Sequence, residues 1–144
     1  MKITNRFTVA VHTLLCIHAF SKGRKVTSEF IASSVKVNPV IIRRTLGQLK
    51  EAGFVAIARG TGGSILARPV GEVTLLDVYK AVESLKGDLF NFHENPRPAC
   101  PVGRNIHKVL DGRLADAQKA MEDSLKKVKL SALSGDLSAL LKAG

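Results

Sequence analysis

The chain has 144 residues and a formal net charge of +10, and this length suffices for one domain with its own core and an appended arm. Lys, Arg, Glu or His interrupts every apolar run, which excludes a membrane span, and the N-terminus shows no signal-peptide core, so a cytoplasmic location is expected. Two cysteines, Cys16 and Cys100, are too few for a disulfide framework.

The positive charge is concentrated in the first half of the chain. Residues 1–70 hold eleven Lys and Arg against two acidic residues, a net charge of +9. Residues 71–144 hold eleven Lys and Arg against ten acidic residues, a net charge of +1. A polyanionic partner of the first half explains this placement, so the charge predicts binding to nucleic acid.

Residues 5–22 are predicted to form the first helix. Its apolar residues fall on two sides, so one side is expected to pack on the rest of the domain and the other on a partner subunit. One stripe consists of Phe7, Ala10, Val11, Leu14, Leu15 and His18, and the second surface of Val9, Cys16, Ile17 and Phe20. His12 and His18 are interpreted as packing or boundary residues, and Cys16 as a small core residue.

A helix-turn-helix is predicted next. Residues 27–35 form a short helix that Thr27 caps, with Ser28 following it. Asn38 caps a second helix with Pro39 at its first position, where a missing N–H costs nothing, and Gly53 closes it.

The two faces of the second helix differ in chemistry. Ile42, Leu46 and Leu49 follow a helical spacing and predict a buried stripe, with Ile41 and Thr45 beside it. A face with adjacent arginines suits the major groove, because a guanidinium group matches guanine edges and phosphates. The residues on this outer face are Val40, Arg43, Arg44 and Gly47.

A β-hairpin is predicted after this helix. Two short apolar runs, residues 54–59 and 64–68, flank the glycine-rich residues 60–63. Glycines let the hairpin tip approach the sugar-phosphate backbone, and Arg59 is expected to reach the minor groove. A phosphate-binding loop is the alternative, but the motif's lysine is missing and a strand follows the glycines.

These elements predict a winged helix-turn-helix that binds DNA, in a fold that is mainly α-helical with a small β-hairpin wing. The simpler alternative is a basic helix pair with a solvated charged face. The expected DNA contacts are Thr27, Ser28, Asn38, Pro39, Val40, Arg43, Arg44, Arg59, Gly60, Thr61, Gly62 and Gly63.

Thr74 is predicted to cap a further helix over residues 75–85. Its core face is expected to contain Leu75, Val78, Val82 and Leu85, while Asp77 and Tyr79 fall elsewhere on the helix. Prolines and asparagines then exclude regular structure from residues 86–103.

A long helix is predicted from Pro101 or Val102 to about Leu130. It carries a narrow apolar seam that is typical of a coiled-coil-like contact with a second copy. The seam consists of Ile106, Leu110, Leu114, Ala117, Met121, Leu125 and Val128. A short closing helix is expected at 137–141. The predicted organisation is therefore a winged helix-turn-helix domain at 1–85, an irregular sensor or linker segment at 86–103, and a dimerisation helix and tail at 104–144.

Cys100 is the candidate sensor residue. It stands just before Pro101 at the start of the long helix, where the helix dipole and nearby basic residues favour a thiolate that oxidants modify. The alternative is a small apolar side chain packed between prolines. A metal site of His93, Cys100 and His107 is a further alternative, although zinc motifs have tighter spacing.

The segments NPVIIRRTLGQLKEAGFVAIARGTGGSILAR and HENPRPACPVG resemble the Rrf2 family of bacterial transcription regulators, and its YwnA-like subgroup in particular. The resemblance covers nearly the whole chain. It implies a homodimer on a palindromic operator, with the long helices crossing at the two-fold axis. By position, Pro39, Arg43 and Arg44 correspond to residues facing the major groove, and Arg59, Gly62 and Gly63 to residues facing the minor groove.

The resemblance also bears on cofactors. The best-known members carry an iron–sulfur cluster on three cysteines in the segment that corresponds to 86–103, whereas this chain has only Cys100 there. No cofactor is therefore expected. Other members are described as sensing oxidants through a cysteine disulfide or as binding a partner enzyme.

The sequence thus predicts a dimeric DNA-binding regulator, a repressor, with double-stranded DNA and a second copy as partners. An enzyme is not expected, because no nucleophile elbow or acid/base pair stands out. The rival hypothesis is a protein-interaction module in which DNA contact is secondary. Such a module gains nothing from a charge of +9 concentrated in residues 1–70.

Overall fold

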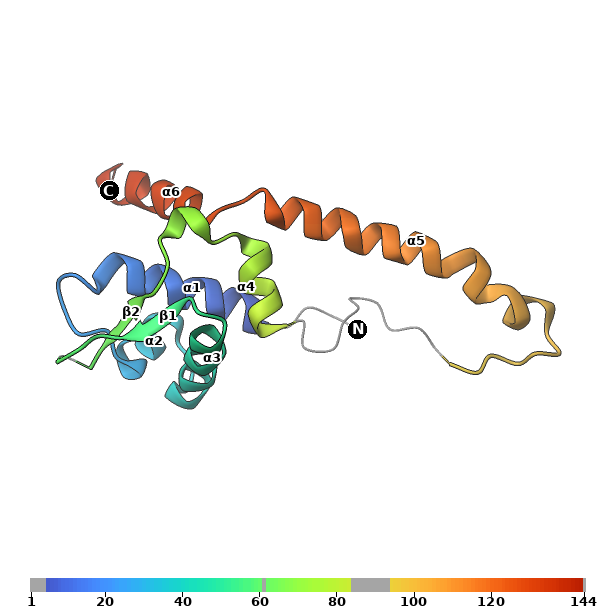
Figure 1. The fold of residues 1–144 in the computed structure, drawn as a ribbon, viewed down its shortest axis with the longest axis horizontal. Helices are drawn as coiled ribbons and strands as arrows, with labels where there is room; N and C mark the ends of the chain where they lie inside the picture. Colours follow the sequence, from blue (N-terminus) through green and yellow to red (C-terminus); the bar gives the residue numbers. More distant parts are fainter. Residues whose placement is uncertain (1–4, 61, 84–93, 144) are drawn as a thin grey trace.

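The computed structural model describes residues 5–60, 62–83 and 94–143. It confirms a mainly helical chain with one antiparallel hairpin (Figure 1). The elements in chain order are α1 (Asn5–Phe20), α2 (Ser28–Val35), α3 (Pro39–Glu51), β1 (Val55–Ile57), β2 (Ser64–Leu66), the 3-10 helix η1 (Val70–Glu72), α4 (Leu75–Val82), α5 (Pro101–Lys126) and α6 (Leu130–Ala143).

The core lies in the body formed by α1 to α4 and the hairpin. Apolar side chains from every one of these helices meet there, because each helix presents one apolar face inward. The largest fully buried side chains include Leu14, Ile17, Ile31, Ile42 and Leu49. This shared core fixes the two helices of the helix-turn-helix relative to α1.

Helix α1 ends at Phe20, two residues before the predicted end. The backbone N–H groups of Gly23 and Arg24 both donate to the carbonyl of Phe20, which closes the last turn early. The prediction that His18 belongs to an apolar stripe is wrong, because this side chain is exposed. The residues that α1 does bury are Val9, Ala10, Thr13, Leu14, Cys16 and Ile17.

Helix α4 begins as predicted but presents a wider core face. Thr74 and Asp77 form a reciprocal capping box at its start. The prediction that Tyr79 lies away from the core is wrong, since this ring is buried and packs edge-on against Phe7 with centroids 5.9 Å apart. Leu85, predicted on the core face, lies outside the described residues.

The predicted single helix to Leu130 is instead two helices with a break at 127–129. Backbone bonding explains the break, because the N–H of Leu75 donates to the carbonyl of Val128 and the N–H of Leu130 to the carbonyl of Val73. Val128 therefore lies beyond the end of α5. Helix α6 is also longer than the closing helix predicted at 137–141, since Leu130 begins it and is buried in the core.

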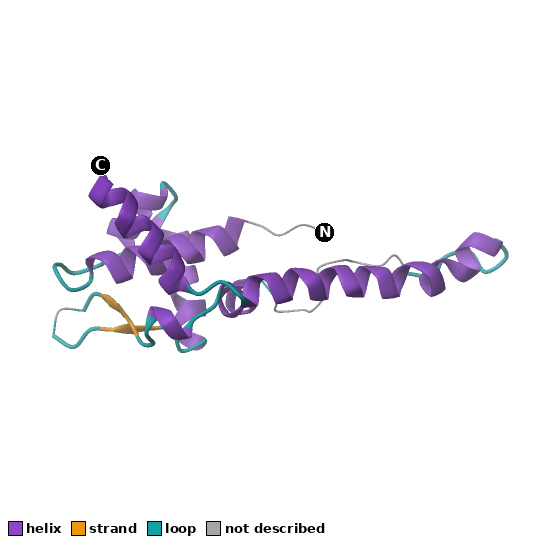
Figure 2. Ribbon diagram, turned by 90° about the horizontal axis from the view of Figure 1, so that it is seen from above, coloured by secondary structure: helices purple, strands orange, loops and turns teal. Residues whose placement is uncertain are grey.

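Helix α5 projects away from the body formed by the other described helices (Figure 2). None of its described residues is buried in the single chain. Its contacts with the body are to α4, near the end of α5 that leads into α6. Among the described residues, no helix combines the length and apolar character that crossing a membrane requires.

Substitution by alanine is expected to change stability in opposite directions at two glycines. A Cβ on Gly63 would lie 2.8 Å from the backbone nitrogen of Val26, so Gly63→Ala is expected to destabilise the fold by about 1–3 kcal/mol. A Cβ on Gly47, within α3, meets no atom within 4 Å, so Gly47→Ala is expected to stabilise by up to about 1 kcal/mol. Urea unfolding of both variants measures the difference. Equal stabilities would show that the approach of residues 25–26 to the wing does not require glycine.

Candidate nucleic-acid interface

The helix-turn-helix is set by two side-chain caps and one strained turn residue. The hydroxyl of Thr27 accepts from the N–H of Phe30 at 3.1 Å, and Asn38 Oδ1 accepts from the N–H of Val40 at 2.9 Å. Lys36 ends α2 in the left-handed conformation, with φ of 64°. These caps satisfy helix N–H groups and fix where α3 begins, as the sequence predicts.

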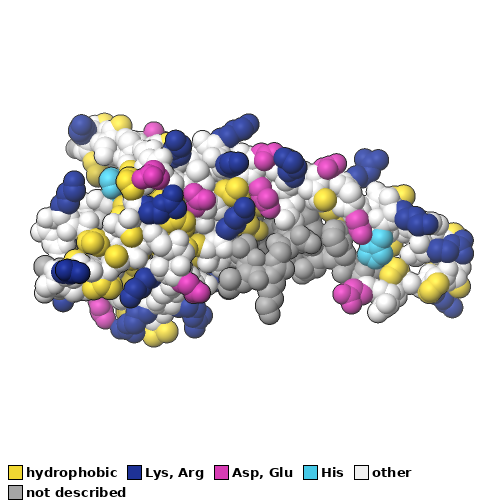
Figure 3. Space-filling model, in the orientation of Figure 1, with side chains coloured by type: hydrophobic (Ala, Val, Ile, Leu, Met, Phe, Trp, Pro, Cys, Tyr) yellow, Lys and Arg dark blue, Asp and Glu magenta, His cyan; other side chains and the backbone are white. Residues whose placement is uncertain are grey.

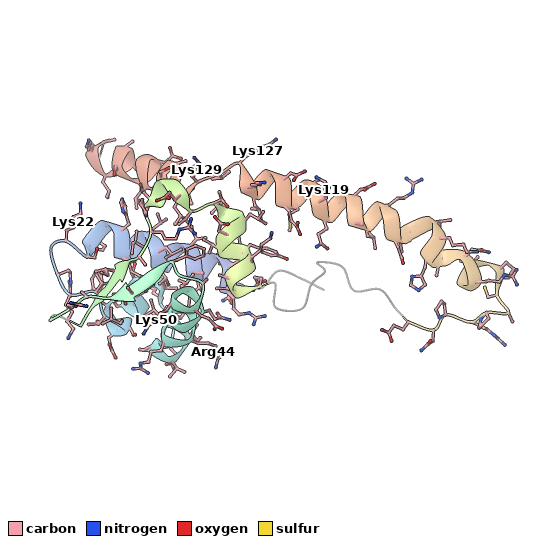
Figure 4. All side chains as sticks on the ribbon, viewed as in Figure 1. Lys22, Arg44, Lys50, Lys119, Lys127 and Lys129 are labelled. Carbon is pink, nitrogen blue, oxygen red and sulfur yellow. The ribbon has the colours of Figure 1, made fainter. Side chains whose placement is uncertain are left out.

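Helix α3 turns one face inward and one outward. Ile42 and Leu49 are fully buried, and Thr45 is buried beside them. The predicted flanking position of Ile41 is wrong, because 40% of this side chain is exposed, on the outer side with Val40 at 52%. Arg43, Arg44 and Gly47 are exposed as predicted. Figure 4 shows Arg44 on the lower edge of the molecule.

Arg43 is held by an acidic residue of α2. Its guanidinium Nη2 donates to Glu29 Oε1 at 3.0 Å, and both side chains are exposed. The pKa of the Glu29 carboxyl lies below its ordinary value. The main cause is a hydrogen bond from the backbone of Glu29, and the second is the hydrogen bond from Arg43. The pair therefore persists at neutral pH and loosens only as pH falls through that lowered pKa. Glu29 was not among the predicted site residues.

Removing the Glu29 charge is expected to strengthen non-specific DNA binding. Glu29→Gln releases Arg43 and removes a negative charge beside the exposed arginine face of α3. One added phosphate contact steepens the slope of log K against log salt by about 0.9. Fluorescence anisotropy with random-sequence duplex at several salt concentrations measures the slope, with Asp116→Asn on α5 as the control. An unchanged slope would show that Arg43 makes no new phosphate contact.

The hairpin forms a wing beside α3, and contacts link β1 to that helix. Val55, Ala56 and Ile57 pair with Leu66, Ile65 and Ser64. At the tip, Gly60 and Gly62 have φ of 81° and 78°, which side chains other than glycine rarely adopt. Arg59 is exposed at this tip, and the predicted contact residue Thr61 lies outside the described residues.

The wing is attached to the segment that precedes α2. The N–H of Ser64 donates to the carbonyl of Val26 at 2.9 Å, and Gly63 is buried against Lys25 and Val26. The predicted backbone approach of Gly63 to DNA is therefore replaced by close packing inside the protein. This packing holds the wing at a fixed distance from α2 and α3.

Basic residues before α2 extend the surface beyond the predicted set. The Arg24 guanidinium stacks over the Phe30 ring at 3.9 Å, and the Lys25 side chain lies against the glycines of the wing. The run KGRK at 22–25 was the sequence signal for them. Figure 3 shows Lys and Arg side chains at the lower left of the molecule, where Figure 1 places α2 and α3.

Cys100 occupies the cap position of α5, as predicted. Its backbone is extended, its thiol is partly buried, and its side chain makes no capping hydrogen bond. The backbone of Arg97 approaches closely, since a Cβ on Gly103 would lie 2.7 Å from the Arg97 carbonyl oxygen. His107 Nδ1 lies 3.0 Å from Asp111 Oδ1.

The predicted dimer residues follow one face of α5. All of those within the helix are partly buried in the single chain except Ala117, which is exposed. They are Ile106, Leu110, Leu114, Ala117, Met121 and Leu125, with Val128 in the segment that follows. Within the described residues, the contacts that cover α5 are those with α4.

Comparison with known proteins agrees with this geometry. The model of the Rrf2 family, described as an iron-dependent transcriptional regulator, matches residues 3–136. YwnA of Bacillus subtilis (strain 168), described as an HTH-type transcriptional regulator, is 42% identical over 123 residues, which cover 85% of this chain and 90% of that protein.

Solved structures share the fold. A crystal structure described as that of a DNA-binding protein is 36% identical with a TM-score of 0.72, covering 89% of this chain and 97% of that one. Oxidised CymR of Staphylococcus aureus is 21% identical with a TM-score of 0.67, covering 93% of this chain and 96% of that one. The latter likeness concerns the fold alone.

The family description mentions iron, and the described residues do not fit an iron site. Cys16 is buried in α1 and Cys100 caps α5. Within residues 5–60, 62–83 and 94–143, no three His, Cys, Asp or Glu side chains gather closely enough to hold a metal. His93, part of the alternative metal set, lies outside these ranges.

The winged helix-turn-helix and the family match now support one conclusion. The match spans nearly all of the chain, from the start of α1 into α6. The relatives that it resembles are regulators of transcription, not enzymes. The chain therefore belongs to the Rrf2 family and is a DNA-binding transcriptional regulator.

Proposed function

We propose that the protein is a homodimeric repressor that binds a palindromic operator, with α3 in the major groove and the wing at the minor groove. The observation that carries this proposal is the exposed arginine face of α3 beside a glycine-tipped wing. In this arrangement Arg43 and Arg44 read bases or phosphates, and Arg59 enters the minor groove.

The partly exposed apolar face of α5 supports a homodimer. Helix α5 has 26 residues, which at about 1.5 Å per residue gives a rod long enough to cross its twin over several turns. Its apolar stripe is partly exposed with respect to the described residues, and a second copy would bury that surface. Two-fold symmetry then places the half-sites about one helical turn apart, or a multiple of it.

Cys100 supports redox control without an iron–sulfur cluster. Its thiol is partly buried at the cap position of α5 and makes no capping hydrogen bond. Hypochlorite converts a thiolate to sulfenic acid and releases chloride, which needs no metal. A single cysteine within residues 86–103 does not provide the family's cluster ligands. Bound to DNA in the cytoplasm, the protein would release its operator on this oxidation.

The test is binding to the protein's own promoter region, before and after mild hypochlorite, with Cys100→Ser and Cys16→Ser in parallel. We expect all three proteins to bind specifically before oxidation. Oxidation is expected to abolish this binding in the native chain and in Cys16→Ser, and to leave it intact in Cys100→Ser. If oxidation changes specific binding in none of the variants, the thiol switch is rejected, whereas specific DNA binding by the protein is still supported. A monomer in sedimentation experiments would reject the dimer and, with it, the palindromic operator.

A further inference from the structure

Lys25 lies at the junction between the wing and the segment that precedes α2. Its backbone is fixed to the wing, because the neighbouring Val26 is only 1% exposed and the Val26 carbonyl accepts from the N–H of Ser64 at 2.9 Å. The Lys25 residue itself is exposed. The fold therefore fixes where this side chain begins and leaves its charge at the surface.

The Lys25 side chain runs along two glycines of the wing. A Cβ on Gly63 would lie 2.9 Å from Lys25 Cγ, and a Cβ on Gly62 would lie 3.7 Å from both Cε and Nζ. The stem therefore passes over Gly63, and the ammonium group lies beside Gly62 at the tip of the wing. A side chain at position 63 would occupy this path, so glycine there gives the lysine its place as well as the backbone of Val26.

The charges near the wing tip determine what this ammonium group binds. Residues 1–70 contain two acidic residues, Glu29 and Glu51, and Glu29 pairs with Arg43. Arg59 is also exposed at the tip, and within the described parts of the chain neither it nor Lys25 pairs with a carboxylate. Cations in this position favour an anionic partner, and the phosphates that border a minor groove supply one.

Packing also prepares Lys25 for such a contact. A lysine side chain loses conformational entropy when binding immobilises it. Part of that loss has already occurred in the free protein, since contact with Gly62 and Gly63 restricts the stem. We propose that Lys25 is a pre-positioned phosphate contact that anchors the tip of the wing beside the minor groove. This role rests on the proposed function, because it requires that the wing meets DNA.

The alternative role of Lys25 is structural. Its aliphatic stem would then cover the glycines of the wing while the ammonium group stays in water. A structural lysine needs only its methylene groups, whereas a phosphate contact needs its charge. Methionine keeps an unbranched stem and lacks the charge, so Lys25→Met separates the two roles. Lys25→Arg keeps the charge and is the variant that restores the contact.

The experiment is fluorescence anisotropy of the full chain with the promoter fragment and with a random duplex of equal length, at several salt concentrations. Lys25→Met is expected to weaken both complexes by the same factor and to reduce the slope of log K against log salt by about 0.9 for each subunit bound. Lys25→Arg is expected to keep the native slope. Lys142→Met is the matched control and is expected to keep it too, because this exposed lysine belongs to α6, on the opposite side of the body from α3 in Figure 1.

Acetylation of lysines, read by mass spectrometry, gives a second measurement on the native chain. We expect Lys25 to be labelled in the free protein and protected in the complex with DNA, and Lys142 to be labelled in both. Thermal unfolding of Lys25→Met confirms that the fold is retained.

Three results would overturn the role of Lys25. They are a native salt slope in Lys25→Met, an equal loss of slope in Lys142→Met, and labelling of Lys25 that DNA leaves unchanged. In each case, a native chain that prefers the promoter fragment over random duplex still supports the proposed function. A native chain without that preference counts against the proposed function itself.

Discussion

Replacing Arg44 with alanine is expected to weaken binding to the specific operator by about 1–3 kcal/mol, the usual value of a bidentate contact between a guanidinium group and a base. Arg44 is exposed on the outer face of α3 and makes no ion pair among the described residues. Its guanidinium is therefore free to meet DNA, whereas Arg43 must first leave Glu29. The loss is expected to be larger on the operator than on random DNA.

Two measurements distinguish base reading from phosphate contact at Arg44. Anisotropy titrations with the promoter fragment and with a random duplex of equal length give the two affinities at one salt concentration. Arg113→Ala, an exposed arginine on α5, is the matched control and is expected to change neither. An equal loss on both duplexes would show that Arg44 contacts phosphate only, and no loss on either would place α3 outside the interface.

Replacing Leu130 with alanine is expected to destabilise the fold by about 2–5 kcal/mol. This side chain is only 1% exposed and belongs to the same core as α1, α3 and α4. Its removal opens a cavity where α6 joins the body, and the neighbouring bond from Leu130 N–H to the Val73 carbonyl limits how far the site collapses.

The matched control for this prediction is Leu140→Ala in the same helix. Leu140 is 70% exposed, so its truncation is expected to change stability by no more than about 0.5 kcal/mol. Urea unfolding followed by circular dichroism gives both values. Equal and small effects would show that α6 contributes little to the stability of the body, and that its packing against α1 is weak.

The sequence by itself determined the helix-turn-helix and the wing. The caps Thr27 and Asn38, and Pro39 at the start of α3, are local signals, because each acts on backbone groups within a few residues. The glycines at 60 and 62 likewise mark positions with positive φ. The spacing of Ile42 and Leu49 identified the buried face of α3, so the outward direction of both arginines followed.

Contacts between distant segments decided what the sequence missed. The break between α5 and α6 depends on backbone bonds to residues 73 and 75, and the sequence around Val128 carries no proline or glycine to signal it. Tyr79 is buried because Phe7 of α1 packs against it, and Gly63 is needed because residues 25–26 lie against the wing.

The pairing of Arg43 with Glu29 and the contacts of His12 and Cys16 with Ser34 also arise only where separate helices meet. Periodicity and capping reflect interactions within one helix and with the residues next to it in the sequence. The energy of contact between helices depends on how they are packed. Tertiary structure alone therefore determined how α6 docks on the body and which residue pairs with Arg43.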